Sequence, residues 1–138
     1  NPGDEIIIRD VWGAITYKGE GVFIAGGAGI TPFISIFRDL QTKHEIAGNT
    51  LIFANKTKAD IILENEFKKL PGLEFINILS DEKADGYYHG MISEEFLKSH
   101  IRNFNRRFYL CGPPPMMNAV KNQLANLGID KNAIVVEF

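Results

Sequence analysis

The sequence contains little of what disulfides and metal sites need. Its 138 residues include one cysteine and three histidines. A single cysteine excludes an internal disulfide and any cluster held by four cysteines of this chain. The histidines are scattered and show no metal-ligand spacing, so no metal site is predicted. The cysteine usage is typical of a reducing, cytoplasmic location.

Basic stripes and long hydrophobic runs are also missing. The formal net charge is −2, and without a basic stripe no nucleic-acid partner is expected. No apolar run approaches the ~20 residues that span a bilayer, so no membrane insertion is expected. The first residues, Asn-Pro-Gly-Asp-Glu, do not resemble a signal peptide, and without an initiator Met the chain is expected to be part of a longer protein. With 45% hydrophobic and 23% charged residues, the chain is predicted to be globular with a real core.

Apolar strands alternate with helical segments along most of the chain. Five strands are predicted, at 21–25, 50–54, 73–79, 108–111 and 134–137, with helices at 33–43, 64–70, 93–100 and 116–127. This alternation predicts an α/β fold with an open, doubly wound parallel five-stranded sheet and helices on both faces. Residues 1–20 hold two short apolar segments, 5–9 and 14–17, which are too small for a core of their own.

A glycine cluster follows the first long strand. Residues 21–32 read Gly-Val-Phe-Ile-Ala-Gly-Gly-Ala-Gly-Ile-Thr-Pro. Gly26, Gly27 and Gly29 permit a tight turn against which a ligand can lie, and Pro32 suits a first helical turn. The amides of such a turn favour an anion such as a pyrophosphate. The alternative is a tight strand-to-helix turn with no ligand.

A second motif follows the fourth strand and reads Cys-Gly-Pro-Pro-Pro-Met-Met, residues 111–117. The three prolines fix the backbone, and Gly112 permits close approach. Taken alone, Cys111 is most simply a small buried hydrophobe. Both motifs fall at carboxyl ends of predicted parallel strands, where such sheets bind ligands.

The order and spacing of these two motifs, with a terminal Val-Glu-Phe, resemble the ferredoxin–NADP reductase family. Residues 53–63, Phe-Ala-Asn-Lys-Thr-Lys-Ala-Asp-Ile-Ile-Leu, are similar to its NADH-using branch. The resemblance implies a Rossmann-like NAD(P)-binding domain over residues 21–138. It implies that residues 1–20 are the end of an FAD-binding β-barrel.

The resemblance also implies roles for individual residues. Thr31 and Cys111 would lie beside the reacting nicotinamide ring and position it, and Phe138 would stack near the flavin. The residues expected to bind cofactor are Gly26, Gly27, Ala28, Gly29, Ile30, Thr31, Pro32, Asn55, Lys56, Asp60, Cys111, Gly112, Pro113, Pro114, Met116 and Phe138. Catalysis would consist of positioning the donor and acceptor rings.

The loop after the second strand is predicted to choose between NADH and NADPH. An acidic side chain there can bind the free ribose hydroxyls and repel a 2′-phosphate, and Asp60 matches that residue in the NADH branch. Lys56 and Lys58 argue the other way, because an ammonium can hold a phosphate. The position of Asp60 within the motif favours NADH, with NADPH as the alternative.

The family's flavin-binding motifs do not occur in this sequence, so a complete flavin site cannot be built from these residues. We therefore expect FAD in the complete enzyme only. The function implied is hydride transfer from NADH or NADPH to FAD, with electrons passed on to a ferredoxin, flavodoxin or haem-type acceptor. The alternative is a non-catalytic, nucleotide-binding regulatory module. We expect the apolar residues of segment 1–20 either to fold back on the main domain or to form a homodimer.

Overall fold

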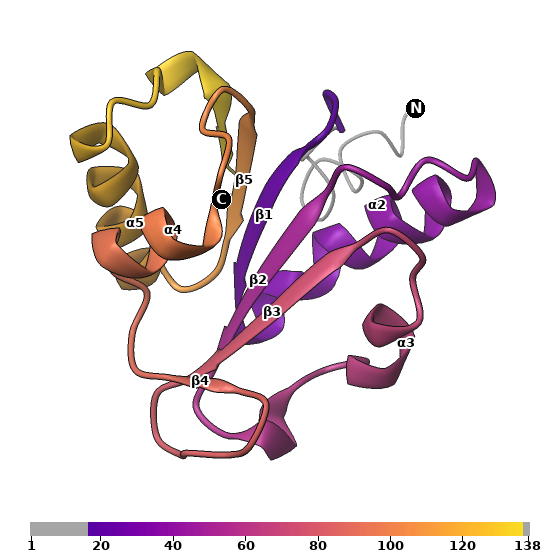
Figure 1. Cartoon of the computed structure of the whole chain (residues 1–138), viewed down its shortest axis with the longest axis horizontal. Helices are drawn as coiled ribbons and strands as arrows, with labels where there is room; N and C mark the ends of the chain where they lie inside the picture. The colour runs from indigo at the N-terminus through magenta and orange to yellow at the C-terminus, as the bar shows by residue number, and fades with distance from the viewer. Residues whose placement is uncertain (1–16, 137–138) are drawn as a thin grey trace, which may run out of the picture.

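The computed structural model describes residues 17–136 of the chain, and these form a three-layer α/β fold (Figure 1). A single parallel sheet has the strand order β4-β3-β2-β1-β5-β6. Its strands are β1 (Gly21–Gly26), β2 (Thr50–Asn55), β3 (Glu74–Leu79), β4 (Tyr88–His89), β5 (Arg107–Cys111) and β6 (Ile134–Val136). The α-helices are α2 (Thr31–Thr42), α3 (Glu64–Lys68), α4 (Glu94–His100) and α5 (Pro114–Asn126). Short 3₁₀ turns lie at η1 (Gly27–Ile30), η2 (Lys58–Asp60) and η3 (Lys131–Ala133).

Strand β1 lies at the centre of the sheet because every one of its residues is apolar or glycine. All six are buried, as expected for a strand covered on both faces. Its neighbours are β2 and β5, both parallel, with Phe23 in register with Leu51 on one side and Tyr109 on the other. The Phe23 and Tyr109 rings stack with their centroids 4.2 Å apart.

Two separate cores fill the two faces of the sheet. Helices α2 and α3 cover one face with Phe33, Phe37, Leu40 and Phe67. Helices α4 and α5 cover the other with Leu97, Met117, Val120 and Leu124 (Figure 1). The predicted helices on both faces are therefore confirmed.

The helix boundaries follow local chemistry. Helix α4 begins after Ser93, whose Oγ accepts a hydrogen bond from the Phe96 amide at 3.1 Å. Helix α5 ends before Gly128, which has a φ of +88°. The sequence predicted both caps.

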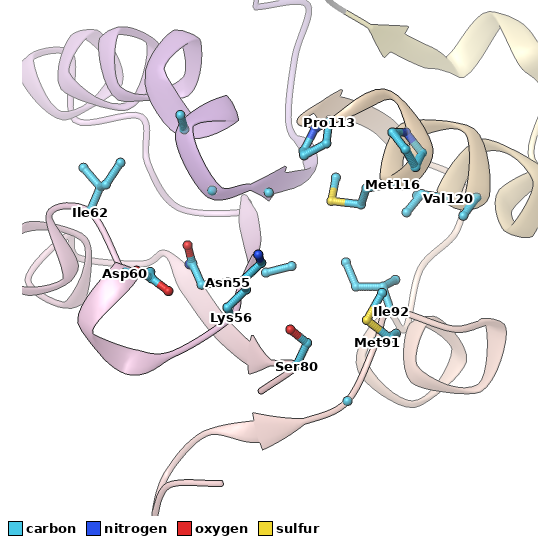
Figure 2. Close-up of a pocket in the computed structure, with 17 residues that line it drawn as sticks. Asn55, Lys56, Asp60, Ile62, Ser80, Met91, Ile92, Pro113, Met116 and Val120 are labelled. Atoms are coloured by element: carbon cyan, nitrogen blue, oxygen red, sulfur yellow. The ribbon is translucent and has the colours of Figure 1, made fainter. Parts of the chain in front are cut away.

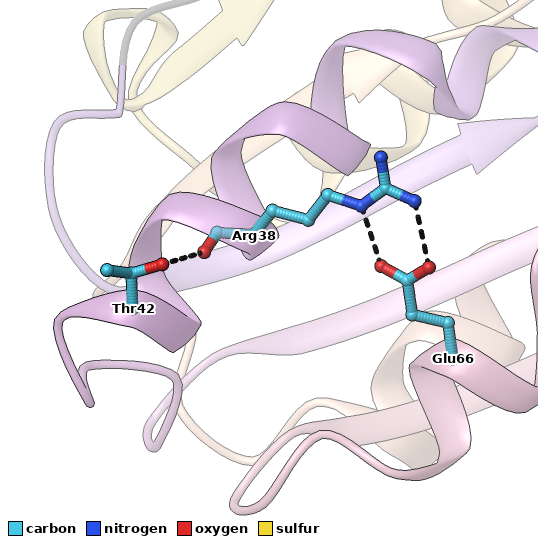
Figure 3. A network of polar contacts seen from close by, with 3 residues as sticks. All are labelled: Arg38, Thr42 and Glu66. Atoms are coloured by element: carbon cyan, nitrogen blue, oxygen red, sulfur yellow. Dashed lines mark hydrogen bonds and ion pairs between the residues drawn. The ribbon is translucent and has the colours of Figure 1, made fainter.

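An exposed ion pair joins helices α2 and α3. The Arg38 guanidinium donates to both Glu66 oxygens at 2.8 and 2.9 Å, and Thr42 Oγ1 donates to the Arg38 carbonyl (Figure 3). Hydrogen bonding and charge from Glu66 raise the pKa of Arg38. The pair is exposed and therefore screened by solvent, so it links the two helices with little gain in stability.

The strand count predicted from the sequence is wrong by one. Tyr88–His89 forms β4, which pairs with the last residues of β3 at the edge of the sheet. Both residues are exposed and belong to no apolar run, so no hydrophobic pattern marks them. Helices α2 and α5 also begin two residues earlier than predicted, at Thr31 and Pro114. Each first turn includes a proline, which is favoured there because its missing N–H would have no partner within the helix.

Residues 1–16 and 137–138 lie outside the described part of the chain. The predicted strands at 5–9 and 14–17, the barrel remnant and the homodimer contact fall wholly or mostly on the first segment. The expected role of Phe138 falls on the second.

Candidate nucleotide-binding site

The two predicted glycine motifs lie side by side at the carboxyl end of the sheet. They follow β1 and β5, which are neighbours although β2, β3 and β4 lie between them in sequence. The connection from β1 leads to one side of the sheet and that from β5 to the other, so this is the switch point at which such sheets bind ligands.

The two turns touch backbone to backbone. A Cβ built on Gly29 would lie 2.5 Å from the Cys111 carbonyl oxygen and 2.7 Å from Gly112 Cα. A Cβ on Gly26 would lie 2.5 Å from the Met116 sulfur. Any larger residue at Gly29 therefore forces the two turns apart. Thr31 Oγ1 closes the first turn by donating to the Ala28 carbonyl at 3.0 Å.

A cavity of about 650 Å³ opens beside these turns (Figure 2). It extends from η1 and the start of α5 across the ends of β2 and β3. Of the predicted cofactor-binding residues, eight line it: Gly26, Gly27, Ala28, Asn55, Lys56, Asp60, Pro113 and Met116. Gly27 has a φ of +52°, and a Cβ there would meet no atom within 4 Å, so its backbone is open.

Seven other predicted residues do not line this cavity. Gly29, Ile30, Thr31, Pro32, Cys111, Gly112 and Pro114 form or flank the contact between the two turns. Cys111 ends β5 opposite Ala25 and is 8% exposed.

The rest of the lining was missed by sequence reasoning. These residues are Ala54, Ile62, Ser80, Gly90, Met91, Ile92, Pro115, Ala119 and Val120. Ser80 directly follows β3 and Gly90 directly follows β4. The rule that ligands lie at carboxyl ends of strands could have identified Ser80, but Gly90 to Ile92 depend on the unpredicted strand β4.

Asn55 lines the cavity with a carboxamide that is buried and has no hydrogen-bond partner in the described structure. The residue is 8% exposed, and neither Nδ2 nor Oδ1 of its carboxamide has a hydrogen-bond partner in the described structure. A buried, unpartnered amide costs about 1–3 kcal/mol, so such groups often mark a place where a ligand or water completes the bonding.

Asp60 and Lys56 are the charged residues among those lining the cavity. The exposed Asp60 carboxylate accepts hydrogen bonds through Oδ2 from the Thr57 amide at 3.1 Å and the Thr57 hydroxyl at 3.0 Å. Asp60 is the last residue of η2, and these bonds fix its carboxylate against Thr57, the residue that precedes η2. Lys58, the other lysine of the predicted loop, lies with its ammonium 5.4 Å from the Tyr87 ring centroid.

His89, the last residue of β4, does not line the cavity. Its Nδ1 lies 2.9 Å from the Glu82 carbonyl oxygen. Within residues 17–136 no group of His, Cys, Asp or Glu is arranged as a metal site. Over the same range no helix is long and apolar enough to cross a membrane.

This fold and site define an NAD-binding domain of an oxidoreductase. Residues 23–122 match the family described as oxidoreductase NAD-binding domain, and the chain belongs to that family. The resemblance stated from the motifs is thereby confirmed, as are the parallel α/β fold and the pyridine-nucleotide class of cofactor.

Similar proteins are reductase components. The chain is 31% identical over 153 residues to one component of the Na⁺-translocating NADH-quinone reductase of Klebsiella pneumoniae. That alignment covers 99% of this chain but only 38% of the relative, so the chain spans less than half of it.

Solved structures agree with this assignment. The flavohem-like FAD/NAD-binding domain of nitric oxide dioxygenase from Vibrio cholerae superimposes with a TM-score of 0.80 at 29% identity, covering 89% of this chain and 52% of that one. The Amycolatopsis cytochrome P450 reductase GcoB gives a TM-score of 0.73 at 27% identity, with 86% and 37% covered. A ferredoxin NADP⁺ reductase from Neisseria gonorrhoeae, 21% identical with a TM-score of 0.71, shares the fold, with 84% and 54% covered.

Proposed function

We propose that this chain is the pyridine-nucleotide half of a flavin-dependent reductase. It would bind NADH at the carboxyl end of the sheet and present it to FAD held elsewhere in the complete enzyme. The observation that carries the proposal is the pair of glycine turns, packed backbone to backbone at the switch point of the sheet, beside a cavity of about 650 Å³. Cavities of about 300–1,000 Å³ are typical of small-molecule and cofactor sites.

The lining residues fit a dinucleotide. The open backbone at Gly27 allows a pyrophosphate to approach the main chain, and the carboxamide of Asn55 needs partners that a ligand can supply. Asp60, held by Thr57, would accept hydrogen bonds from the ribose hydroxyls. Ile62 and Met91, both exposed apolar side chains in the cavity lining, would cover the adenine ring.

Thr31 and Cys111 would position the reacting ring. Both lie at the junction of the turns rather than in the cavity, as expected if the nicotinamide crosses that junction toward a flavin on the other side. The cofactors supply hydride chemistry, and the protein supplies orientation and exclusion of water. The contact between Gly29 and the Cys111 carbonyl sets the spacing of this junction.

The acceptor and the domain arrangement are part of the proposal. The similar proteins are named for quinone, nitric oxide and cytochrome P450 chemistry, which supports a one-electron carrier or haem domain as the acceptor. We retain the division into a barrel remnant at 1–20 and a nucleotide domain at 21–138, with homodimerisation through 1–20 and a cytoplasmic location as further expectations.

Amide chemical shifts of the ¹⁵N-labelled chain during titration with NADH test this proposal. We expect the largest changes at residues 26–28 and 56–60, and none at Gly48 or Arg107 on the opposite edge of the sheet. Shifts confined to other surfaces, or no binding at millimolar NADH, would contradict it. In the complete protein, anaerobic NADH should bleach the flavin absorption. Binding without bleaching would support the regulatory alternative.

A further inference from the structure

The loop after β3 lies against the loop after β2. The Ser80 amide donates to the Asn55 carbonyl at 3.0 Å, and the Asp81 amide donates to the Lys56 carbonyl at 2.9 Å. These bonds continue the pairing of β2 with β3 past the ends of both strands. As a result, residue 82 is brought beside the η2 turn that carries Asp60.

At that turn two consecutive backbone amides are each occupied by a carboxylate. The Thr57 amide donates to Asp60 Oδ2 at 3.1 Å, and the Lys58 amide donates to Glu82 Oε1 at 2.7 Å. Glu82 comes from a different loop, 24 residues further along the chain. The turn therefore holds two negative charges, and only one of them lies within the loop that sequence reasoning singled out.

A phosphate bound at this place would need the same donors. Phosphate sites use backbone amides and cationic side chains, and here both amides already donate to carboxylates. Among the described residues that line the cavity, Lys56 is the only basic one. Lys58 lies over the Tyr87 ring instead.

We propose that Glu82 is a second specificity-determining carboxylate, which acts with Asp60 to exclude the 2′-phosphate of NADPH. This inference rests on the proposed function, because it assumes that the adenosine ribose lies near Asp60. Glu82 does not itself line the cavity, but Asp60 does. The buried, unpartnered carboxamide of Asn55, which lines the same cavity as Asp60, independently indicates that a ligand binds there. Glu82 would act by charge repulsion and by keeping the Lys58 amide unavailable.

Two substitutions separate these effects. Glu82→Gln removes the charge but keeps an oxygen that accepts from the Lys58 amide. Glu82→Ala removes the charge and frees the amide for a phosphate. The matched control is Glu45→Gln, an exposed glutamate in the connection that precedes β2, at the opposite edge of the sheet.

Calorimetric titration of the chain with 5′-AMP and with 2′,5′-ADP measures discrimination, because the two ligands differ only by the 2′-phosphate. We expect the parent to prefer 5′-AMP. The dissociation constant for 2′,5′-ADP divided by that for 5′-AMP should fall about two- to fivefold in Glu82→Gln, because a screened charge interaction is modest. It should fall further in Glu82→Ala and stay unchanged in Glu45→Gln. The charge effect should also diminish at high salt.

A purely structural role for Glu82 gives a different result. Glu82→Ala would then bind both ligands more weakly by the same factor. The ratio of the two dissociation constants would stay at the parent value, and that result overturns the inference. A parent that prefers 2′,5′-ADP overturns it as well but leaves the proposed nucleotide function standing. If the parent binds neither ligand and NADH causes no amide shifts, the proposed function itself fails.

Discussion

Cys111 and Gly29 share one contact that links the two halves of the site. A Cβ built on Gly29 would lie 2.5 Å from the Cys111 carbonyl oxygen, and Cys111, at the end of β5, is 8% exposed. A small buried cysteine is often only a hydrophobe, yet this one ends the strand at the switch point. In the proposed function, its thiol would affect the orientation of the nicotinamide ring rather than the binding of phosphates.

Cys111→Ala should slow hydride transfer more than it weakens nucleotide binding. We expect a loss of about 10–100-fold in the rate of flavin reduction, because small displacements of reacting atoms are costly. Cys111→Ser, which is similar in size, should lose less. Anaerobic stopped-flow reduction of the complete protein by NADH measures the rate and the affinity together. Equal losses in both would show that Cys111 does not position the ring.

Glu64 is a partly buried carboxylate with two side-chain partners, Tyr87 and Lys68. Its side chain is 17% exposed, and its carboxylate accepts hydrogen bonds from the Tyr87 hydroxyl and from Lys68. Partial burial raises the pKa of Glu64, but the bonds from Tyr87 and Lys68 and the charges of Lys68 and Lys58 together lower it below its ordinary value. This contact joins the loop after β3 to helix α3.

Tyr87→Phe should therefore destabilise the fold in a pH-dependent way. A depressed carboxyl pKa contributes stability above the unfolded-state pKa, and that stability is lost as pH falls through the folded-state pKa. We expect a loss of about 1 kcal/mol at pH 7, which shrinks below about pH 4. Urea denaturation at pH 7 and pH 3.5 measures it. Tyr88→Phe, at a half-exposed ring, is the control, and a pH-independent loss would disprove the assignment.

The turns after β1 and β5 act as one unit. Gly29→Ala should destabilise the chain by about 1–3 kcal/mol, because the new methyl group would lie 2.5 Å from the Cys111 carbonyl oxygen. NADH affinity should fall as well, since the turns form one wall of the cavity. Urea denaturation and NADH titration measure the two effects.

Gly86→Ala, in the loop between β3 and β4, is the matched control for Gly29→Ala. Gly86 has a φ of +85°, and a Cβ there would meet no atom within 4 Å. It should cost about 1 kcal/mol through backbone strain alone and leave NADH affinity unchanged. If Gly29→Ala behaves in the same way, the two turns are not coupled as the geometry indicates.

At the scale of residues 17–136, the cavity and a network of hydrogen bonds around Arg106 lie at opposite ends of the parallel strands. The carboxyl edge carries the cavity and the open glycine turn. The amino edge is closed by Arg106, whose Nη2 donates to the Gly48 carbonyl at 2.6 Å and the Gly21 carbonyl at 3.0 Å. There the Gly21 amide also donates to Asn49 Oδ1 at 2.9 Å.

Arg106→Met should therefore lower stability without affecting nucleotide binding. Loss of hydrogen bonds from a charged donor should cost about 1–3 kcal/mol. The dissociation constant for NADH should stay within twofold of the parent value. Arg102→Met, at an exposed arginine between α4 and β5, should change neither quantity. A large loss of affinity in Arg106→Met would show that the two edges are not independent.

The sequence by itself determined the fold class, the strands that form the core and the two motifs of the site. Continuous apolar runs and the Ser93 and Gly128 caps are local signals, and each was confirmed. The glycine and proline clusters form the two turns at the carboxyl end of the sheet, and their contact with a cofactor stays a prediction. The family followed from the same motifs, whose glycines and prolines are restricted to particular backbone conformations.

Only the tertiary structure decided which other residues share the site. Strand β4 has no hydrophobic pattern and exists because it pairs with β3, and with it come Gly90, Met91 and Ile92 in the cavity lining. Glu82 reaches the η2 turn because the pairing of β2 with β3 continues past the strand ends. Contacts between segments distant in sequence depend on register and strand order, and neither is encoded in any single stretch of the chain.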